Sequence, residues 1–366
     1  MRRVSLLGRI PPIAAAFALS RNGWLAITLV FALILALEAA LQWRAYRQSG
    51  ISIFTPARND GAATARAGIK TYPPNAVIRG NKIEIRTNAL GLRSPDISPL
   101  PAKNELRLAV MGASTVAGAY TPKNEQLFSQ QLTALLRRRH SGPVSVVNAG
   151  IPGTTVREMG IMLDRVISPL RPRLVFVYTG FNDIANICKA NTKKTPPPIR
   201  LAYPQMPSRL LLPELVKKNT ASLRMAYTVS GTGLRRSNKI VPQAVVAYRK
   251  EVEGLASIAR RKNVELVFVS SLAAYRQNMP RKMQESLSEQ ALYYVKCLDL
   301  NGLYKAMDLL NRIQAETAQK YGFDYVDLRQ KVWGGRGNFV DSNHFTPTGE
   351  RAVAAALSDY LSRKTR

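Results

Sequence analysis

A serine that could act as a nucleophile directly follows a short apolar run. Residues 108–111 (LAVM) have the length and composition of a buried strand, and residues 112–115 (GAST) break it. Glycine lets the chain turn sharply at that point. We therefore expect Ser114 to project from the carboxyl end of a strand, where open α/β sheets bind their ligands. A nucleophilic serine also requires a base, a group that orients the base, and donors for an oxyanion.

Two later stretches contain groups that can hold an oxyanion. Residues 148–153 (NAGIPG) follow a second apolar run, and their two glycines allow backbone N–H groups to approach a ligand closely. Residues 180–183 (GFND) follow a third apolar run, and the side-chain amide of Asn182 can donate a hydrogen bond to a developing oxyanion. Both stretches are predicted to lie at the same edge of a sheet as Ser114.

The base must come from one of only two histidines. His140 ends a basic run that begins at Arg137, and we expect a solvated helix terminus there. His344 stands three residues after Asp341 in a DSNH stretch. On one turn, the carboxylate can hydrogen-bond the imidazole and fix its tautomer, which leaves the other ring nitrogen free for Ser114.

The elements that must position these residues alternate between strands and helices from residue 105 onward. The predicted strands are 106–111, 144–148, 174–179, 264–270 and 324–327. The predicted helices are 125–139, 156–167, 244–262, 303–321 and 348–363. Strands joined by crossover helices form a parallel sheet covered on both faces, and right-handed crossovers make it a three-layer α/β/α sandwich.

The amino-acid composition limits which classes of protein this chain can belong to. The 366 residues are 46% hydrophobic and 21% charged, which is typical of a folded chain with a sizeable core. The formal net charge of +30 predicts attraction to anionic partners, such as an acidic glycan or lipid headgroups. The cysteines and histidines lack metal-ligand spacing, and the loop glycines at 231–233 and 334–337 lack the strand–helix context of a dinucleotide site. We therefore predict no metal and no cofactor.

The N-terminal part of the chain has the pattern of a membrane anchor. Residues 1–23 form a basic tail without acidic residues, and residues 24–43 are almost wholly apolar between two tryptophans. About 20 helical residues span a hydrocarbon core, and tryptophans suit its interfaces. A buried core helix and a cleaved signal peptide are the alternatives, although Glu38 disrupts the small-residue pattern of a cleavage site. We favour an uncleaved, single-pass signal anchor with the bulk of the chain outside.

Two further segments precede or interrupt the alternating pattern. Residues 44–104 are predicted to be a linker and a small β-rich module, with a half-exposed strand at 82–87. Residues 185–303 are predicted to be a basic insertion into a catalytic domain at 105–366, because residues 189–282 hold 19 Lys and Arg against four Glu and no Asp. This charge indicates either a solvated face or a lid toward an anionic surface or substrate. Without a nucleic-acid-binding motif, a nucleic acid partner is not predicted.

The two cysteines, Cys188 and Cys297, bracket much of this insertion. If the domain is exported, they can form a disulfide. A loop of this length makes such a cross-link worth up to about 4–5 kcal/mol in the chain-entropy description. Two buried free thiols are the alternative.

The four stretches, in this order, resemble the sequence blocks of the SGNH (GDSL-type) hydrolase superfamily. The resemblance covers residues 106–361 apart from the basic insertion, and it implies a flavodoxin-like parallel sheet. The catalytic residues that it implies are Ser114, Asp341 and His344, and the oxyanion-hole residues are Ser114, Gly153 and Asn182. Gly150 is the alternative to Gly153. The family's Gly-Asp-Ser is Gly-Ala-Ser here, which changes a residue outside the catalytic set.

The resemblance implies a serine esterase of the bacterial envelope. Residues 86–94 (RTNALGLRS) are similar to a segment found ahead of such domains in membrane-anchored bacterial members. We therefore expect an inner-membrane protein with its catalytic domain on the periplasmic or extracellular side. Its expected reaction is hydrolysis of O-acetyl or other short acyl esters of an envelope carbohydrate or lipid. An O-acyltransferase acting on envelope glycans and a non-catalytic, membrane-tethered binding factor are the alternatives.

Overall fold

Five parallel strands form the central sheet of the molecule. In this computed structural model the described residues are 21–49, 64–66, 69–79, 83–185, 210–213, 215–216, 219–220, 223 and 236–364. The strands are β5 (Leu106–Gly112), β6 (Val144–Gly150), β7 (Leu174–Tyr178), β8 (Leu266–Val269) and β9 (Asp324–Val326). Their order across the sheet is β6-β5-β7-β8-β9, and every neighbouring pair is parallel. Each predicted strand is present.

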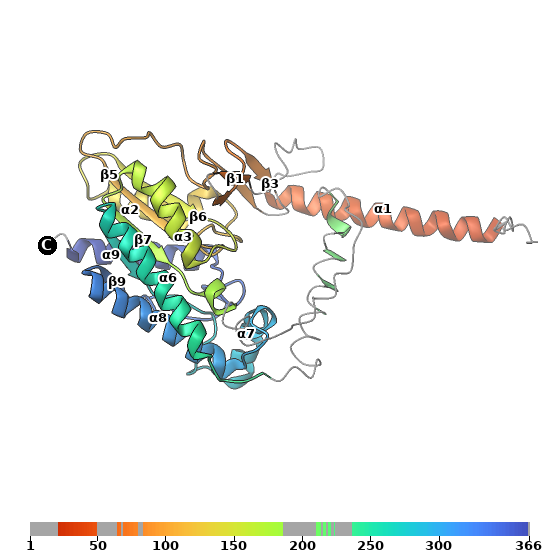
Figure 1. Cartoon of the computed structure of the whole chain (residues 1–366). Coiled ribbons are helices and arrows are strands. Elements are labelled where there is room, and N and C mark those ends of the chain that lie inside the picture. Colours follow the sequence, from red (N-terminus) through yellow and green to blue (C-terminus); the bar gives the residue numbers. More distant parts are fainter. Residues whose placement is uncertain are drawn as a thin grey trace, which may run out of the picture.

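Helices cover both faces of this sheet (Figure 1). On one face, α2 (Phe128–Arg137) packs against α9 (Pro347–Lys364). On the other face, α3 (Val156–Met162) contacts α6 (Pro242–Arg261), which in turn contacts α8 (Leu300–Tyr321). β7 and β8 are buried at every residue, because strands covered on both faces must be apolar throughout. The predicted three-layer α/β/α sandwich is confirmed.

Several helical segments lie outside our predictions or differ from them. The short ones are η1 (Asn124–Gln126), η2 (Leu163–Ile167) and η3 (Ser168–Leu170). α7 (Arg281–Tyr294) lies between β8 and α8 in the chain and contacts α8. The apolar periodicity did not reveal it, because its buried residues include the polar Gln284 and Ser288.

Part of the predicted basic insertion belongs to the sandwich itself. β8 is the fourth strand of the sheet, and α6 and α7 precede and follow it in the chain. An insertion that interrupts the sandwich can therefore extend only as far as the start of α6, not to residue 303. The remaining division of the chain into domains stays a prediction.

Only one end of the predicted disulfide falls within the described residues. Cys297 is disulfide-bonded. Its predicted partner, Cys188, lies outside the described residues, so the pairing stays a prediction.

α1 (Arg21–Ser49) projects away from the sandwich as a single long helix (Figure 1). Its stretch Asn22–Arg44 is long and apolar enough to cross a membrane, and none of it is buried within the molecule. This exposure disfavours the alternative of a core helix, which would bury such side chains. Glu38, the acidic residue of this stretch, accepts the backbone N–H groups of Leu211 and Leu212 at 2.8 and 2.7 Å. Of the basic tail predicted at 1–23, residues 1–20 lie outside the described residues, and residues 21–23 form the start of α1.

Four short strands form the small module between α1 and the sandwich. β1 (Thr64–Arg66) pairs with β2 (Ile69–Thr71), and β3 (Val77–Arg79) pairs with β4 (Glu84–Arg86), both antiparallel. The half-exposed strand predicted at 82–87 corresponds to β4. The module is therefore β-rich, as predicted.

Arg93 ties the end of this module to the sandwich. Its side chain is completely buried. It donates hydrogen bonds to the carbonyl oxygens of Ala117, Gly118 and Thr121 at 3.0, 2.6 and 2.8 Å. These three carbonyls belong to the turn that follows Ser114. Because a buried guanidinium is costly unless its donors are satisfied, Arg93 and this turn hold each other in place.

Replacing Arg93 with methionine will lower the free energy of unfolding by about 3–5 kcal/mol, because several buried carbonyls lose their donor. Urea denaturation of the full-length protein in detergent measures this loss. Arg86→Met is the matched control, since the Arg86 side chain is 58% exposed in an ion pair with Glu84. The control should cost less than about 1 kcal/mol. Equal losses for the two variants would contradict the role given to Arg93.

Candidate active site

Ser114 lies in the turn directly after β5, at the carboxyl edge of the sheet. β5 ends at Gly112, where a Cβ atom would lie 2.2 Å from Val116 Cγ2 and 2.7 Å from the carbonyl oxygen of Tyr178. No residue with a side chain fits this position without displacing the turn or β7. The glycine that marked this turn in the sequence is therefore required by close packing.

Ser114, His344 and Asp341 form a hydrogen-bonded relay. Ser114 Oγ lies 2.8 Å from His344 Nε2, and His344 Nδ1 lies 2.7 Å from Asp341 Oδ2. The side chains of His344 and Asp341 are only 12% and 14% exposed. The structure thus brings together three residues that are separated by up to 230 positions in the chain. This is the geometry that a serine nucleophile, a base and an orienting carboxylate require.

Asp341 accepts hydrogen bonds from backbone N–H groups as well as from the His344 ring. Its Oδ1 accepts hydrogen bonds from the N–H groups of Asn343 and His344 at 3.0 and 2.9 Å. Burial opposes the charge, but the hydrogen bond and charge of His344, together with these N–H groups, keep the pKa of Asp341 below its usual value. An ionised Asp341 can stabilise an imidazolium on His344.

A side-chain contact joins the turn that holds Ser114 to the turn that holds His344. Thr115 Oγ1 lies 3.3 Å from the carbonyl oxygen of Asn343 and 3.2 Å from its Nδ2. Both residues are buried. This contact fixes the separation of Ser114 and His344.

The predicted oxyanion-hole residues differ in how the structure places them. Asn182 lines the cavity beside Ser114, and its Nδ2 donates one hydrogen bond to the carbonyl oxygen of Thr154 at 2.9 Å. The second hydrogen of that amide is available for an oxyanion. Of the two glycines, Gly150 donates its N–H to Asn148 Oδ1 at 2.9 Å, whereas Gly153 has φ +81° and open space around its Cα. These observations favour Gly153 over Gly150 as an oxyanion donor. The assignment of Gly153 to the oxyanion hole stays a prediction.

Asn182→Ala will lower kcat for p-nitrophenyl acetate by about 10²- to 10³-fold with little change in KM, because the lost hydrogen bond strengthens only in the transition state. Steady-state kinetics of the full-length protein test this. Asn301→Ala, at an exposed position of α8, is the control and should leave both constants unchanged. A rise in KM without a fall in kcat would instead assign Asn182 to substrate binding.

Asp183 supports the site and was not predicted. Its two carboxylate oxygens accept the N–H of Val156 at 3.2 Å and the hydroxyl of Thr179 at 3.0 Å. Burial raises the pKa of Asp183 to about 7. Asp183 thereby joins the start of α3 to the end of β7, the two segments that position Asn182. In the sequence, only its position directly after Asn182 indicated that Asp183 lies near the site.

Tyr120 is a second neighbour of the relay that the sequence did not reveal. Its ring packs edge-on against the His344 ring, with 5.1 Å between the ring centroids. Burial, followed by the charge of the nearby Asp341, raises the pKa of the Tyr120 hydroxyl. Tyr120 therefore packs against the base and lies near the carboxylate that orients it. No local pattern marks such a residue, because the contact depends on the fold.

The cavity beside Ser114 is small. Its volume is about 20 Å³, which is roughly the space of one water-sized group. Buried or half-buried side chains line it, among them Met159, Tyr178 and Phe181. Within the described part of the chain, no group of three or more His, Cys, Asp and Glu side chains could hold a metal ion.

Comparisons with known proteins found one matching family and several similar solved structures. Residues 110–352 match the model of the GDSL-like lipase/acylhydrolase family. Similar solved structures include a GDSL-like lipase from Bacteroides thetaiotaomicron (17% identity, 72% of this chain and 91% of that chain, TM-score 0.40). Another is a lipase/acylhydrolase from Enterococcus faecalis (15% identity, 70% and 96%, TM-score 0.42). A third is an α/β hydrolase from the metagenome of Lake Arreo, Spain (14% identity, 72% and 97%, TM-score 0.43). A search of curated proteins gives no match.

Proposed function

Because the chain belongs to the GDSL-like lipase/acylhydrolase family, which makes it a hydrolase, we propose that it is a serine esterase for short acyl esters of an envelope carbohydrate or lipid. The observation that carries this proposal is the Ser114–His344–Asp341 relay, with its 2.8 and 2.7 Å contacts, at the carboxyl edge of the sheet. The family supplies the reaction class, and the relay supplies the groups that perform it.

In the proposed first step, Ser114 Oγ attacks the ester carbonyl carbon while His344 Nε2 takes the hydroxyl proton. The carbonyl oxygen becomes an oxyanion, held by the backbone N–H groups of Ser114 and Gly153 and the amide of Asn182. His344 then returns the proton to the departing alcohol, and an acyl–serine ester remains. In the second step, His344 takes a proton from water as the water oxygen attacks the acyl carbon. His344 then returns this proton to Ser114 Oγ as the acyl–oxygen bond breaks, which releases the acid and restores Ser114.

The cavity beside Ser114 supports a short acyl group. A volume of about 20 Å³ accommodates the methyl group of an acetyl ester but not an extended chain. Met159 and Tyr178 line it and are almost completely buried. We therefore propose acetyl esters as the preferred substrates.

α1 supports placement at a membrane. We propose that its stretch Asn22–Arg44 crosses the inner membrane once and that the sandwich lies on the periplasmic side. Protease added to spheroplasts should then digest the sandwich, while inverted vesicles should protect it. Protection in spheroplasts would overturn this orientation.

Two measurements on the full-length protein in detergent test the proposed activity. Hydrolysis of p-nitrophenyl esters should be fastest for acetate and should fall steeply at butyrate and octanoate. A fluorophosphonate probe should label the folded protein at Ser114 and nowhere else. Absence of labelling would favour the binding factor. Transfer of acetyl groups to an added glycan in preference to water would favour the acyltransferase.

A further inference from the structure

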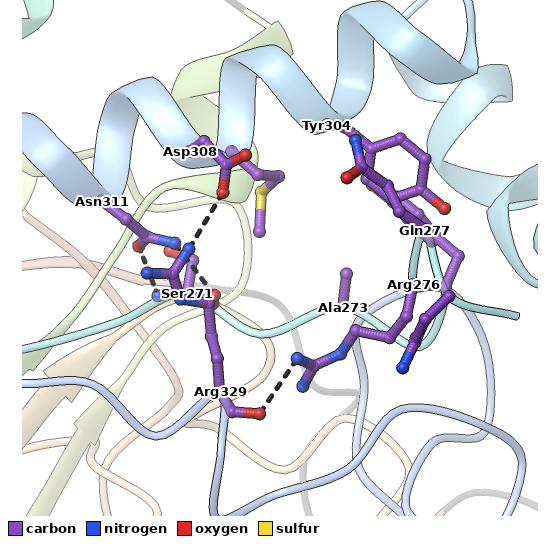
Figure 2. Close-up of a pocket in the computed structure, with 11 residues that line it drawn as sticks. Ser271, Ala273, Arg276, Gln277, Tyr304, Asp308, Asn311 and Arg329 are labelled. Atoms are coloured by element: carbon purple, nitrogen blue, oxygen red, sulfur yellow. Dashed lines mark hydrogen bonds and ion pairs between the residues drawn. The ribbon is translucent and has the colours of Figure 1, made fainter.

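A second cavity, of about 320 Å³, lies at the carboxyl ends of β8 and β9 (Figure 2). Its walls are the loop 271–278 that follows β8, the N-terminal half of α8, and Arg329, which follows β9. Its volume falls at the lower end of the range for small-molecule sites, about 300–1,000 Å³. Open α/β sheets bind their ligands along this edge, which the candidate active site also occupies.

One loop forms the wall between this cavity and the candidate active site. Ser271 Oγ donates to the carbonyl oxygen of Thr179, at the end of β7. The N–H of Ala274 donates to the carbonyl oxygen of Ser342, inside the turn that carries the base, at 2.9 Å. β8 lies two strands away from β5, about 10 Å at the usual strand spacing. A polymer can therefore occupy this cavity while one of its esters lies at the nucleophile.

Arg276 gives the cavity a positive charge that forms no ion pair with a carboxylate among the described residues. Its guanidinium donates to the carbonyl oxygens of Arg329 and Val332 at 3.0 and 2.8 Å, and its Nε is buried without a hydrogen-bond partner among the described residues. Burial, followed by the like charge of Arg329, lowers the pKa of Arg276, and the charge of Asp327 offsets this only in part. Arg329 differs, since ion pairs with Asp308 and Asp327 neutralise it. An anionic group on a ligand would compensate Arg276.

The remaining walls combine an aromatic ring with polar side chains. The ring of Tyr304 borders the cavity opposite Arg329, with Gln277 next to it (Figure 2). The Tyr304 ring packs at 5.5 Å, centroid to centroid, against Tyr275, whose buried hydroxyl has no hydrogen-bond partner in the described residues. Asp308 lies on the same helix as Tyr304. A ring beside hydrogen-bonding groups fits a sugar, which has both apolar C–H faces and hydroxyl edges.

We propose that this cavity is a subsite for a carboxylate-bearing sugar residue of an acidic polysaccharide whose acetyl esters react at Ser114. Arg276 binds the carboxylate, Tyr304 packs against the sugar ring, and Asp308 accepts a hydrogen bond from a hydroxyl group. The formal net charge of +30 draws such a polyanion to the protein. The proposal rests on the proposed esterase function and names its substrate class.

Kinetics with three acetyl esters test this subsite: O-acetylated polygalacturonate, neutral O-acetylated xylan and p-nitrophenyl acetate. We expect Arg276→Gln to raise KM for the acetylated polygalacturonate by about 10- to 100-fold, the effect of losing one charge-assisted contact. KM for the xylan and kcat for p-nitrophenyl acetate should stay unchanged. Lys305→Gln, which removes an exposed charge from α8 outside the cavity, is the matched control and should leave all three constants unchanged. Equal effects of the two variants, or no effect of Arg276→Gln, would overturn the proposal.

A binding measurement keeps the proposal testable if Arg276→Gln misfolds or if the protein proves not to be an esterase. The unmodified full-length protein is titrated calorimetrically with trigalacturonate and with xylotriose. We expect trigalacturonate to bind at least about 10-fold more tightly, and Tyr304→Leu to weaken it by about the same factor. Equal affinities for the two trisaccharides, or no effect of Tyr304→Leu, would overturn the subsite whatever the catalytic result.

Discussion

Ser114→Ala will lower kcat for p-nitrophenyl acetate by about 10⁶-fold, the size of effect seen when a serine nucleophile is removed. The alanine cannot form the acyl intermediate, and His344 then has no hydroxyl to deprotonate. The residual rate should be the rate that the oxyanion donors and substrate binding provide without a nucleophile. Stopped assays with long incubation measure such a rate in the full-length protein.

The fold of this variant should stay intact, because only one oxygen atom is removed from a half-buried side chain. Its thermal unfolding midpoint should lie within a few degrees of that of the unmodified protein. Ser286→Ala, on the exposed side of α7, is the matched control and should keep full activity and stability. Full activity of Ser114→Ala would refute the assignment of the nucleophile. Loss of fluorophosphonate labelling with retained stability would support it.

Asp341→Asn will lower kcat by about 10⁴-fold, because an amide neither fixes the required tautomer of His344 nor stabilises its protonated form. The present contacts, 2.7 and 3.0 Å from His344 Nδ1 to the two carboxylate oxygens, are those of a charge-assisted pair. KM should change little, since Asp341 does not line the cavity beside Ser114. Steady-state kinetics with p-nitrophenyl acetate measure both constants.

Asp359→Asn provides the control for Asp341→Asn, because it removes an exposed carboxylate on α9 outside the site. It should leave kcat unchanged. If Asp341→Asn retained activity within threefold of the unmodified enzyme, Asp341 would not orient the base. An intermediate loss that Tyr120→Phe reproduces would assign part of the effect to the tyrosine hydroxyl, whose pKa the charge of Asp341 raises.

Much of the fold could be predicted because its signals are local. A parallel strand buried on both faces, such as β7, must be apolar along its whole length, and a glycine ends the strand where the chain turns. The candidate site was visible for the same reason. Ser114, Asn182 and the pair Asp341 and His344 each follow a strand or precede a helix, and parallel strands bring their carboxyl ends to one edge.

The tertiary structure decided what depends on contacts between distant residues. The hydrogen bond between Ser114 and His344 joins residues 230 positions apart in the chain. The role of Arg93 follows from carbonyl groups 24 to 28 positions away, and the packing of Tyr120 follows from a histidine in another turn. The unpaired charge of Arg276 could not be read from its neighbours in the chain. A residue's partners and its access to water are properties of the packed molecule, whereas strand and turn patterns are properties of a few adjacent residues.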